Sequence, residues 1–288
     1  MSDAELRGLE RELSVNPISL ELRRRHARLL QRAGDEERAL AALDLAWRLG
    51  GEDLYPELQE LLEPLALDLG VLQLRYVPGG LFVMGIDDFD DDAAPPHLVR
   101  LSPFWISQAP LTYAVLRGYA GQDGWFKSLS LSFDDPGGEF WLEQTLNVEF
   151  RRAQDAIQHL SARDQPPGLA GHYAFPSEAE WERATRAALL RPDGKSPYGL
   201  DPDSEPQWTQ DHYHPRYYQA SPAFDPRGPG AGTDRVVRGI QAVPPAHYAI
   251  YRDAADDSGT FRVGGSSGSG RPVRVEGGLS TRVVFRCR

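Results

Sequence analysis

The chain of 288 residues has one cysteine, two methionines and no long apolar run, and these shortages exclude several classes of protein. The single cysteine, Cys287, rules out a disulfide within the chain. No apolar run approaches the roughly 20 residues that cross a bilayer. The first residues lack the basic and apolar stretches of a secretory signal. Together these features lead us to expect a cytoplasmic protein with no membrane partner.

Lysine is also scarce, since Lys127 and Lys195 are the two in the chain and arginine supplies the other positive charges. The net charge of −11 argues against a nucleic-acid partner. The charge is unevenly spread: residues 1–70 hold 9 arginines and 15 acidic residues, whereas residues 235–288 hold 9 arginines and 4 acidic residues. The C-terminal fifth is therefore the basic end of an acidic protein.

The first 70 residues have the apolar spacing of helices. Residues 20–30 and 36–49 flank a turn at Gly34-Asp35, and a third helix is predicted over residues 53–63. The pair resembles a tetratricopeptide-repeat hairpin. A repeat array needs about three copies to be stable. The sequence contains one recognisable copy of the repeat, so we expect a helical appendage packed on a larger domain. The apolar positions are Leu20, Ala27, Leu30, Leu40, Leu43, Ala46 and Trp47.

Residues 175–187, F-P-S-E-A-E-W-E-R-A-T-R-A, predict a well-capped helix. Ser177 stands at the N-cap position and Glu180 follows three residues later, which is the spacing of a capping box. Trp181 and Ala184 lie on one narrow apolar face. We therefore expect a structural helix with Trp181 in the core.

This stretch closely resembles the L-P-T-E-A-E-W-E-Y-A box of the formylglycine-generating enzyme (sulfatase-modifying factor) family. Other boxes follow in the order of that family, and the resemblance covers about residues 74–288. It implies an α+β protein, with a C-type-lectin-like domain over residues 71–288 after a helical appendage over residues 1–70. The other matching segments are residues 76–85 (strand, turn, strand), 96–106 (a strand), 112–119 and 147–163 (helices), 225–239, and 285–287.

Members of the family that make formylglycine bind Cu(I) through two cysteine thiolates between the R-G-G box and the terminal G-F-R. Soft thiolates suit that ion. The corresponding residues 238–285 contain no cysteine, and Cys287 lies in the terminal box. One thiol cannot form a two-thiolate site, so we expect no catalysis of this kind and no copper. The iron-dependent branch of the family uses several histidines in a helical region, where this chain has His26 alone.

A calcium cofactor is not expected either. The D-M-x-G-N segment that helps to bind structural calcium in the family is missing before Trp208. The acidic loop at residues 87–92 lacks the alternating spacing of a calcium loop, which favours a solvated loop. Residues 264–268 match G-x-S-x-G by letter, but no helix pattern follows, so a mobile loop is predicted there.

The family's substrate groove is walled by its W-T-x-D loop and by the segment between the R-G box and the C-terminus. By resemblance these walls are residues 208–218 and 238–286 here. Both are rich in the aromatic and arginine side chains of interface hot spots. The candidate ligand-binding residues are Trp208, His212, Tyr213, His214, Tyr217, Tyr218, Arg238, His247, Tyr248, Tyr251 and Arg252.

We therefore expect a non-catalytic relative of the family that binds a peptide or protein ligand of acidic or aromatic character as an accessory factor. A second hypothesis is a metal-dependent oxidative enzyme that uses His212, His214 and His247, since alternate residues of a strand point the same way. A third is a lectin-like variable protein that displays a ligand-binding surface. Alternatively, the C-terminal arginines only pair with the acidic N-terminal helices.

Overall fold

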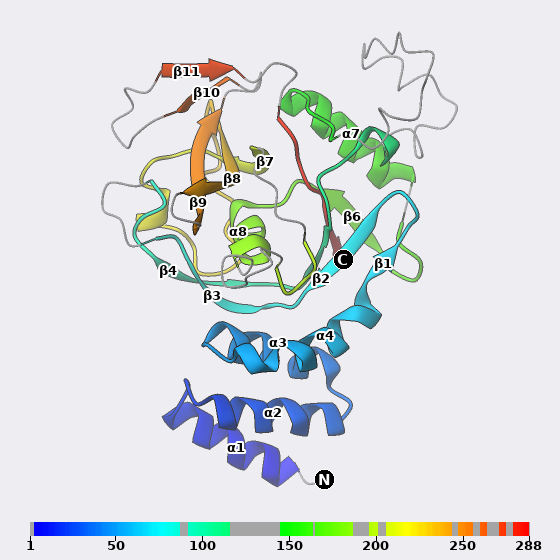
Figure 1. The fold of residues 1–288 in the computed structure, drawn as a ribbon, viewed down its shortest axis with the longest axis vertical. Helices are drawn as coiled ribbons and strands as arrows, with labels where there is room; N and C mark the ends of the chain where they lie inside the picture. Colours follow the sequence, from blue (N-terminus) through cyan, green and yellow to red (C-terminus); the bar gives the residue numbers. More distant parts are fainter. Residues whose placement is uncertain are drawn as a thin grey trace.

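The fold consists of a stack of N-terminal helices below a larger body of strands and helices (Figure 1). The expected α+β class is confirmed. No helix in the described part of the chain is long and apolar enough to cross a membrane. The computed structural model describes residues 3–86, 92–115, 145–163, 165–186, 196–200, 206–243, 247–255, 260–263, 271–274 and 279–287.

The N-terminal stack contains α1 (Asp3–Val15), α2 (Leu20–Arg32), α3 (Glu36–Arg48) and α4 (Tyr55–Leu62). Each helix packs on the next one along the chain. The side chains of Ser19 and Asp35 accept hydrogen bonds from the first turns of α2 and α3, as expected of N-caps. Gly34, at a φ of +77°, makes the predicted turn between them. Short 3-10 turns, Glu52–Leu54 and Glu63–Leu65, flank α4.

One hydrophobic cluster runs through the helical stack and the body. It contains Leu30 and Leu43 of the stack together with Phe82 and Ala184 of the body. All the apolar positions predicted for the stack are buried except Leu20, which is half-buried and packs against the cluster. The helices are therefore packed on the body, as expected, while the division at residues 70 and 71 stays a prediction.

The first five-stranded sheet brings the end of the chain into its interior. Its order is β1 (Leu67–Asp68), β2 (Gln73–Val77), β5 (Phe104–Ser107), β12 (Val284–Cys287) and β6 (Gly171–Ala174). β12 pairs antiparallel with both β5 and β6, so Phe285 lies opposite Trp105 and Tyr173. α7 (Phe150–Arg163) contacts β6. Its predicted apolar stripe is buried, namely Phe150, Ala153, Ile157 and Leu160.

The second five-stranded sheet has the order β11 (Arg271–Arg274), β10 (Thr260–Val263), β9 (His247–Ala255), β8 (Arg235–Val243) and β7 (Gln207–His212). β8 and β9 form a long hairpin in register from Arg235↔Ala255 to Val243↔His247. β7 adds to the other side of β8, with Trp208 opposite Val237. Much of the predicted ligand-binding segment is therefore strand.

A two-stranded sheet, β3 (Gly80–Met84) with β4 (His97–Leu101), forms the floor of the body next to α3 (Figure 1). The single strand predicted over residues 96–106 is wrong, because β4 and β5 lie in different sheets. Ser102 and Pro103 separate them. The Asp225 carboxylate accepts hydrogen bonds from the Ser102 N–H at 2.7 Å and the Ser102 hydroxyl at 2.8 Å, which holds this break open.

Helix α8 (Glu178–Arg186) lies in the middle of the body above β3 and β4 (Figure 1). Three expectations fall on residues outside the described ranges: the predicted helix beyond residue 115, most of the acidic loop at 87–92, and the loop at 264–268.

Candidate functional site

The N-terminus of α8 has the predicted capping box. The Ser177 N–H donates to the Glu180 carboxylate at 2.7 Å, and the Glu180 N–H donates to the Ser177 hydroxyl at 3.1 Å. Asp211, at the end of β7, accepts a third hydrogen bond from the Glu178 N–H at 2.9 Å. Three N–H groups at this end of α8 are thus satisfied, and the buried carboxylates lie at the positive end of the helix dipole.

α8 is buried on all sides, and not only along the apolar face predicted from its sequence. Glu178, Glu180, Glu182 and Arg183 are each at most 5% exposed. Buried charges are costly unless they are paired and hydrogen-bonded. Each of these four side chains has such partners, so the helix is a hub for the strands and helices around it.

Arg238 of β8 joins two of these glutamates. Its guanidinium lies 3.1 Å from the Glu178 carboxylate and 2.6 Å from that of Glu182, and 5.5 Å from the ring centroid of Trp181. The Tyr218 hydroxyl donates to the same Glu178 oxygen at 2.9 Å. Arg238 and Tyr218 are 1% and 2% exposed. Both side chains are buried against α8, which corrects their prediction as ligand-binding residues.

Arg286 of β12 pairs with the third glutamate. Its Nη2 lies 2.6 Å from Glu180 Oε2. Burial acts to raise the pKa of Glu180, but the charge and hydrogen bonds of Arg286 outweigh it, so this pKa lies below its ordinary value. In the described structure, Arg238 and Arg286 pair with α8. For these two arginines, the alternative that basic C-terminal residues pair with the N-terminal helices is therefore wrong.

The N-terminal stack is fastened to α8 through Asp44 of α3. Arg183 Nη2 lies 2.8 Å from the Asp44 carboxylate, and Arg48 Nε lies 3.0 Å from the same oxygen. The Tyr198 hydroxyl donates to the other oxygen of Asp44. Burial acts to raise the pKa of Asp44, but Arg48 and Arg183 outweigh it and lower this pKa. Asp44, Arg48, Arg183 and Tyr198 thus form one ionic cluster that joins the N-terminal stack to the body.

Trp208 belongs to the core and does not face a ligand. Its side chain is 0% exposed, its indole N–H donates to the Val148 carbonyl at 3.0 Å, and its ring meets Phe150 edge-on at 5.5 Å between centroids. The prediction of Trp208 as a ligand-binding residue is therefore corrected. No alternation along β7 separates Trp208 from its neighbours, because Gln207, Thr209 and Asp211 are buried as well.

Among the candidates whose side chains are described, those that are not fully buried lie at the end of β7 and in the loop after it. His212, Tyr213 and Tyr217 are half-buried, and His214 is exposed. The Tyr213 hydroxyl donates to the carboxylate of Asp92. Burial, with the negative charge of Asp211 as a smaller cause, raises the pKa of Tyr217. We call residues 212–217 the tyrosine loop.

The four other candidates lie on β9. In the register of the hairpin, His247, Tyr248, Tyr251 and Arg252 stand opposite Val243, Ala242, Gly239 and Arg238. Their backbone is described and their side chains are not. β8 lies between β9 and β7, so these positions lie in the sheet whose edge strand, β7, leads into the tyrosine loop.

Metal ligands do not gather in the described ranges, where no group of three or more His, Cys, Asp or Glu side chains could hold an ion. His212 ends β7, and His214 lies beyond it with its Nδ1 accepting a hydrogen bond from the Arg216 N–H at 3.1 Å. Cys287 is exposed at the end of β12, opposite Gly171.

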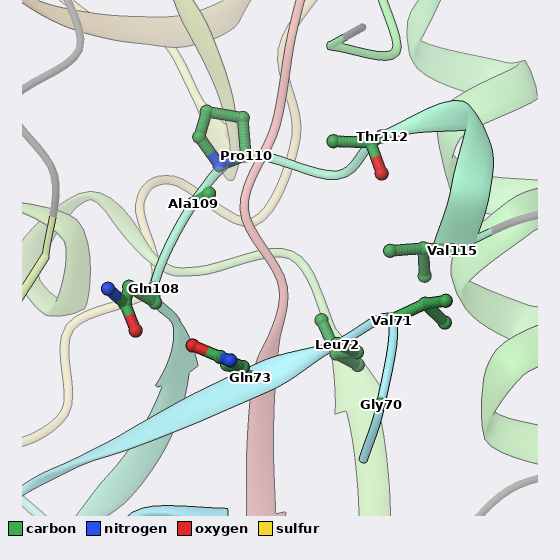
Figure 2. A pocket seen from close by; sticks show the side chains of 9 residues that line it. All are labelled: Gly70, Val71, Leu72, Gln73, Gln108, Ala109, Pro110, Thr112 and Val115. Carbon is green, nitrogen blue, oxygen red and sulfur yellow. The ribbon is translucent and has the colours of Figure 1, made fainter. Parts of the chain in front are cut away.

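A cavity of about 220 Å³ opens at the edge of the first sheet, away from the predicted site (Figure 2). Figure 2 shows the amide groups of Gln73 and Gln108 directed toward one another across it. It is smaller than the roughly 300–1,000 Å³ of typical ligand pockets, and its lining has no charged side chain. The lining residues are Gly70, Val71, Leu72, Gln73, Gln108, Ala109, Pro110, Thr112 and Val115.

Comparisons with known proteins agree with this fold. Residues 71–207 match the sulfatase-modifying factor enzyme 1-like domain. A formylglycine-generating enzyme from Streptomyces coelicolor is 26% identical over 262 residues, which cover 64% of this chain and 83% of that protein. Residues 71–207 are thus similar to a sulfatase-modifying factor domain. Over the matched part, the chain is similar to a formylglycine-generating enzyme.

A solved structure has a similar fold. Treponema denticola variable protein 1 superposes with a TM-score of 0.53 at 18% identity, and the match covers 77% of this chain and 98% of that one. The structure of PvdO from Pseudomonas aeruginosa superposes with a TM-score of 0.47 at 19% identity, covering 74% and 94%.

Proposed function

We propose that this protein is a non-catalytic relative of the formylglycine-generating enzymes that binds a peptide or protein as an accessory factor. The cysteine content carries this proposal, since Cys287 is the one thiol in the chain. A two-thiolate copper site needs a second cysteine. The α8 hub and its partners keep the fold, while the thiol pair of the catalytic members is missing. Neither copper nor calcium is part of the proposed protein.

The tyrosine loop and β9 are the proposed ligand-binding surface. Tyr213 and Tyr217 are held partly buried, and the hydroxyl of Tyr213 is fixed by Asp92. Tyrosines restrained in this way offer a large amphipathic contact area at low cost in conformational entropy. Arg216 is exposed beside them, which favours an acidic or aromatic ligand.

The similarity in fold to Treponema denticola variable protein 1 favours a second candidate, a lectin-like protein that displays a variable ligand-binding surface. Its signature would be sequence variation among close copies of this chain that is confined to the last fifty residues. Variation spread evenly over the chain would contradict it.

The catalytic part of the proposal is tested with the full chain, Cu(I) and a cysteine-containing peptide that the Streptomyces enzyme converts. We expect mass spectrometry to find no formylglycine, and metal analysis of the purified protein to find no stoichiometric copper, iron or zinc. Multiple turnovers would overturn the proposal, and a stoichiometric metal would favour a metal-dependent enzyme.

The binding part is tested by panning phage-displayed random peptides on the full chain. We expect Tyr217→Ala and Tyr251→Ala to weaken selected peptides about tenfold, as substitutions of hot-spot residues do. Ile18→Ser, which alters a 69% exposed residue in the N-terminal stack, is the matched control. If both tyrosine variants bind normally while substitutions in residues 20–63 abolish binding, the N-terminal stack carries the peptide-binding surface.

A further inference from the structure

The outer face of the β3–β4 sheet carries a row of exposed apolar side chains. In β3, Leu81 and Val83 are 45% and 48% exposed, while Phe82 and Met84 between and after them are buried. In β4, Leu98 is 63% exposed. The inner face of this sheet packs on the core under α8, so the alternation leaves the outer apolar residues in solvent.

The register gathers these residues into one surface. Val83 stands opposite Leu98, and Leu81 stands opposite Arg100. On its other side Arg100 forms a parallel bridge with Phe224, which is 68% exposed and lies under the Arg100 guanidinium at 5.9 Å. We call Leu81, Val83, Leu98, Arg100 and Phe224 the hairpin face. It lies on the β3–β4 sheet and is distinct from the β8–β9 hairpin.

Both long edges of this sheet are partly occupied by bonds within the chain, which leave little room for a partner to add as another strand. On the β3 side, Arg183 donates to the carbonyls of Gly80 and Leu81 at 3.4 and 3.3 Å. Arg186 donates to the Val83 carbonyl at 3.0 Å. On the β4 side, the N–H and carbonyl of Arg100 bond with residues 223 and 225 at 2.8 and 3.0 Å. A partner therefore lies across the face.

A partner that lies across the face must satisfy its own backbone, because it does not pair with the edges of the sheet. A helix does so and an extended peptide does not. The four exposed apolar side chains offer on the order of 400 Å², the size of the largest patch on a typical monomer, whereas a standard interface takes about 800 Å² from each partner. The area suits one helix and is small for a stable dimer.

The positive charge of Arg100 indicates what kind of helix would bind this face. Arg100 forms no ion pair with any carboxylate of the described residues, and its guanidinium lies over the Phe224 ring. The whole chain carries a charge of −11, which disfavours a second copy as the partner. We propose that the hairpin face binds an amphipathic helix of a partner protein, with apolar residues on Leu81, Val83 and Leu98 and a carboxylate opposite Arg100.

The test pans a phage-displayed library of helical peptides on the full chain. We expect the selected peptides to share apolar residues at i, i+3 or i+4 and i+7, with an adjacent Asp or Glu. Leu98→Asp and the milder Leu98→Ser should weaken them by about tenfold or more. Ile18→Asp is the matched control, since Ile18 is 69% exposed on the turn after α1 and Leu98 is 63% exposed. Thermal melts check that each variant is folded.

Arg100→Gln tests the charge. We expect it to weaken binding roughly two- to five-fold, as for an exposed ion pair. This loss should disappear with a synthetic probe peptide whose acidic residue is changed to Gln, because the pair is then already broken.

Several outcomes would overturn the proposal: no peptide is selected, selected peptides bind folded Leu98→Asp and Leu98→Ser as well as wild type, or they lack the acidic residue. Concentration-dependent dimers that Leu98→Ser abolishes would mean that a second copy covers the face. The hairpin face does not depend on the proposed function. Tyr217→Ala should still bind these peptides. If Tyr217→Ala loses binding while Leu98→Ser binds normally, the peptides bind the tyrosine loop instead.

Discussion

Asp44→Ala tests the joint between the N-terminal stack and α8. Asp44 is 1% exposed and faces Arg183, whose side chain is also 1% exposed, at 2.8 Å and Arg48 at 3.0 Å. The substitution leaves two guanidinium groups next to each other without their carboxylate. Removing one partner of a buried ion pair costs about 3–5 kcal/mol, because the remaining charge is uncompensated. We expect the free energy of unfolding to fall by that amount.

Asp53→Ala is the matched control, because Asp53 pairs with Arg24 in the same stack while its side chain is 72% exposed. Such a pair contributes about 1 kcal/mol at most. Urea unfolding of both variants, followed by circular dichroism, gives the midpoint and the slope. The shared core predicts one transition for wild type, and Asp44→Ala should separate the stack from the body. Equal midpoints for Asp44→Ala and Asp53→Ala would refute the reasoning.

Three further predictions concern single residues. Trp181→Ala should cost about 3–5 kcal/mol in urea unfolding, because it leaves a cavity at a 1% exposed site; a near-normal midpoint would contradict the packing of α8. Cys287→Ser should retain peptide binding and melting temperature, because the thiol is exposed; loss of binding in the folded variant would overturn the non-catalytic proposal. The folded pKa of Glu180 is lowered, so its stabilisation is present above its unfolded pKa and is lost as pH falls through the folded pKa. Arg286→Met should therefore flatten the acid dependence of the urea midpoint below about pH 4.3, and an unchanged profile would exclude this role.

The sequence predicted the features that depend on near neighbours. The capping box needs Ser177 and Glu180 alone, three residues apart, and both of its hydrogen bonds form. The helical stripes of α3 and α7 follow a period of 3.6 residues, and their apolar positions are buried. The family motifs are likewise local patterns, which is why the fold class was predictable.

The candidate site was much less predictable. Composition identified an aromatic and arginine-rich segment, but it could not separate the buried Trp208 and Tyr218 from the half-buried Tyr213 and Tyr217. That distinction depends on contacts with distant segments: Trp208 packs on Val148 and Phe150, and Tyr218 packs on Glu178 of α8. Arg238 was predicted as a ligand contact because its carboxylate partners lie about sixty positions earlier in the chain.

The sequence alone predicted the helices α2, α3 and α8, the cap of α8 at Ser177 and the family pattern that the chain resembles, because each depends on residues within a few positions. Only the tertiary structure decided that α8 is buried on every side, since its glutamates are stable there only with Arg238 and Arg286 brought in from distant strands. It also decided that Leu98 and Phe224, far apart in the sequence, share one exposed face through Arg100. Pairing between distant segments sets both results, and no local spacing encodes it.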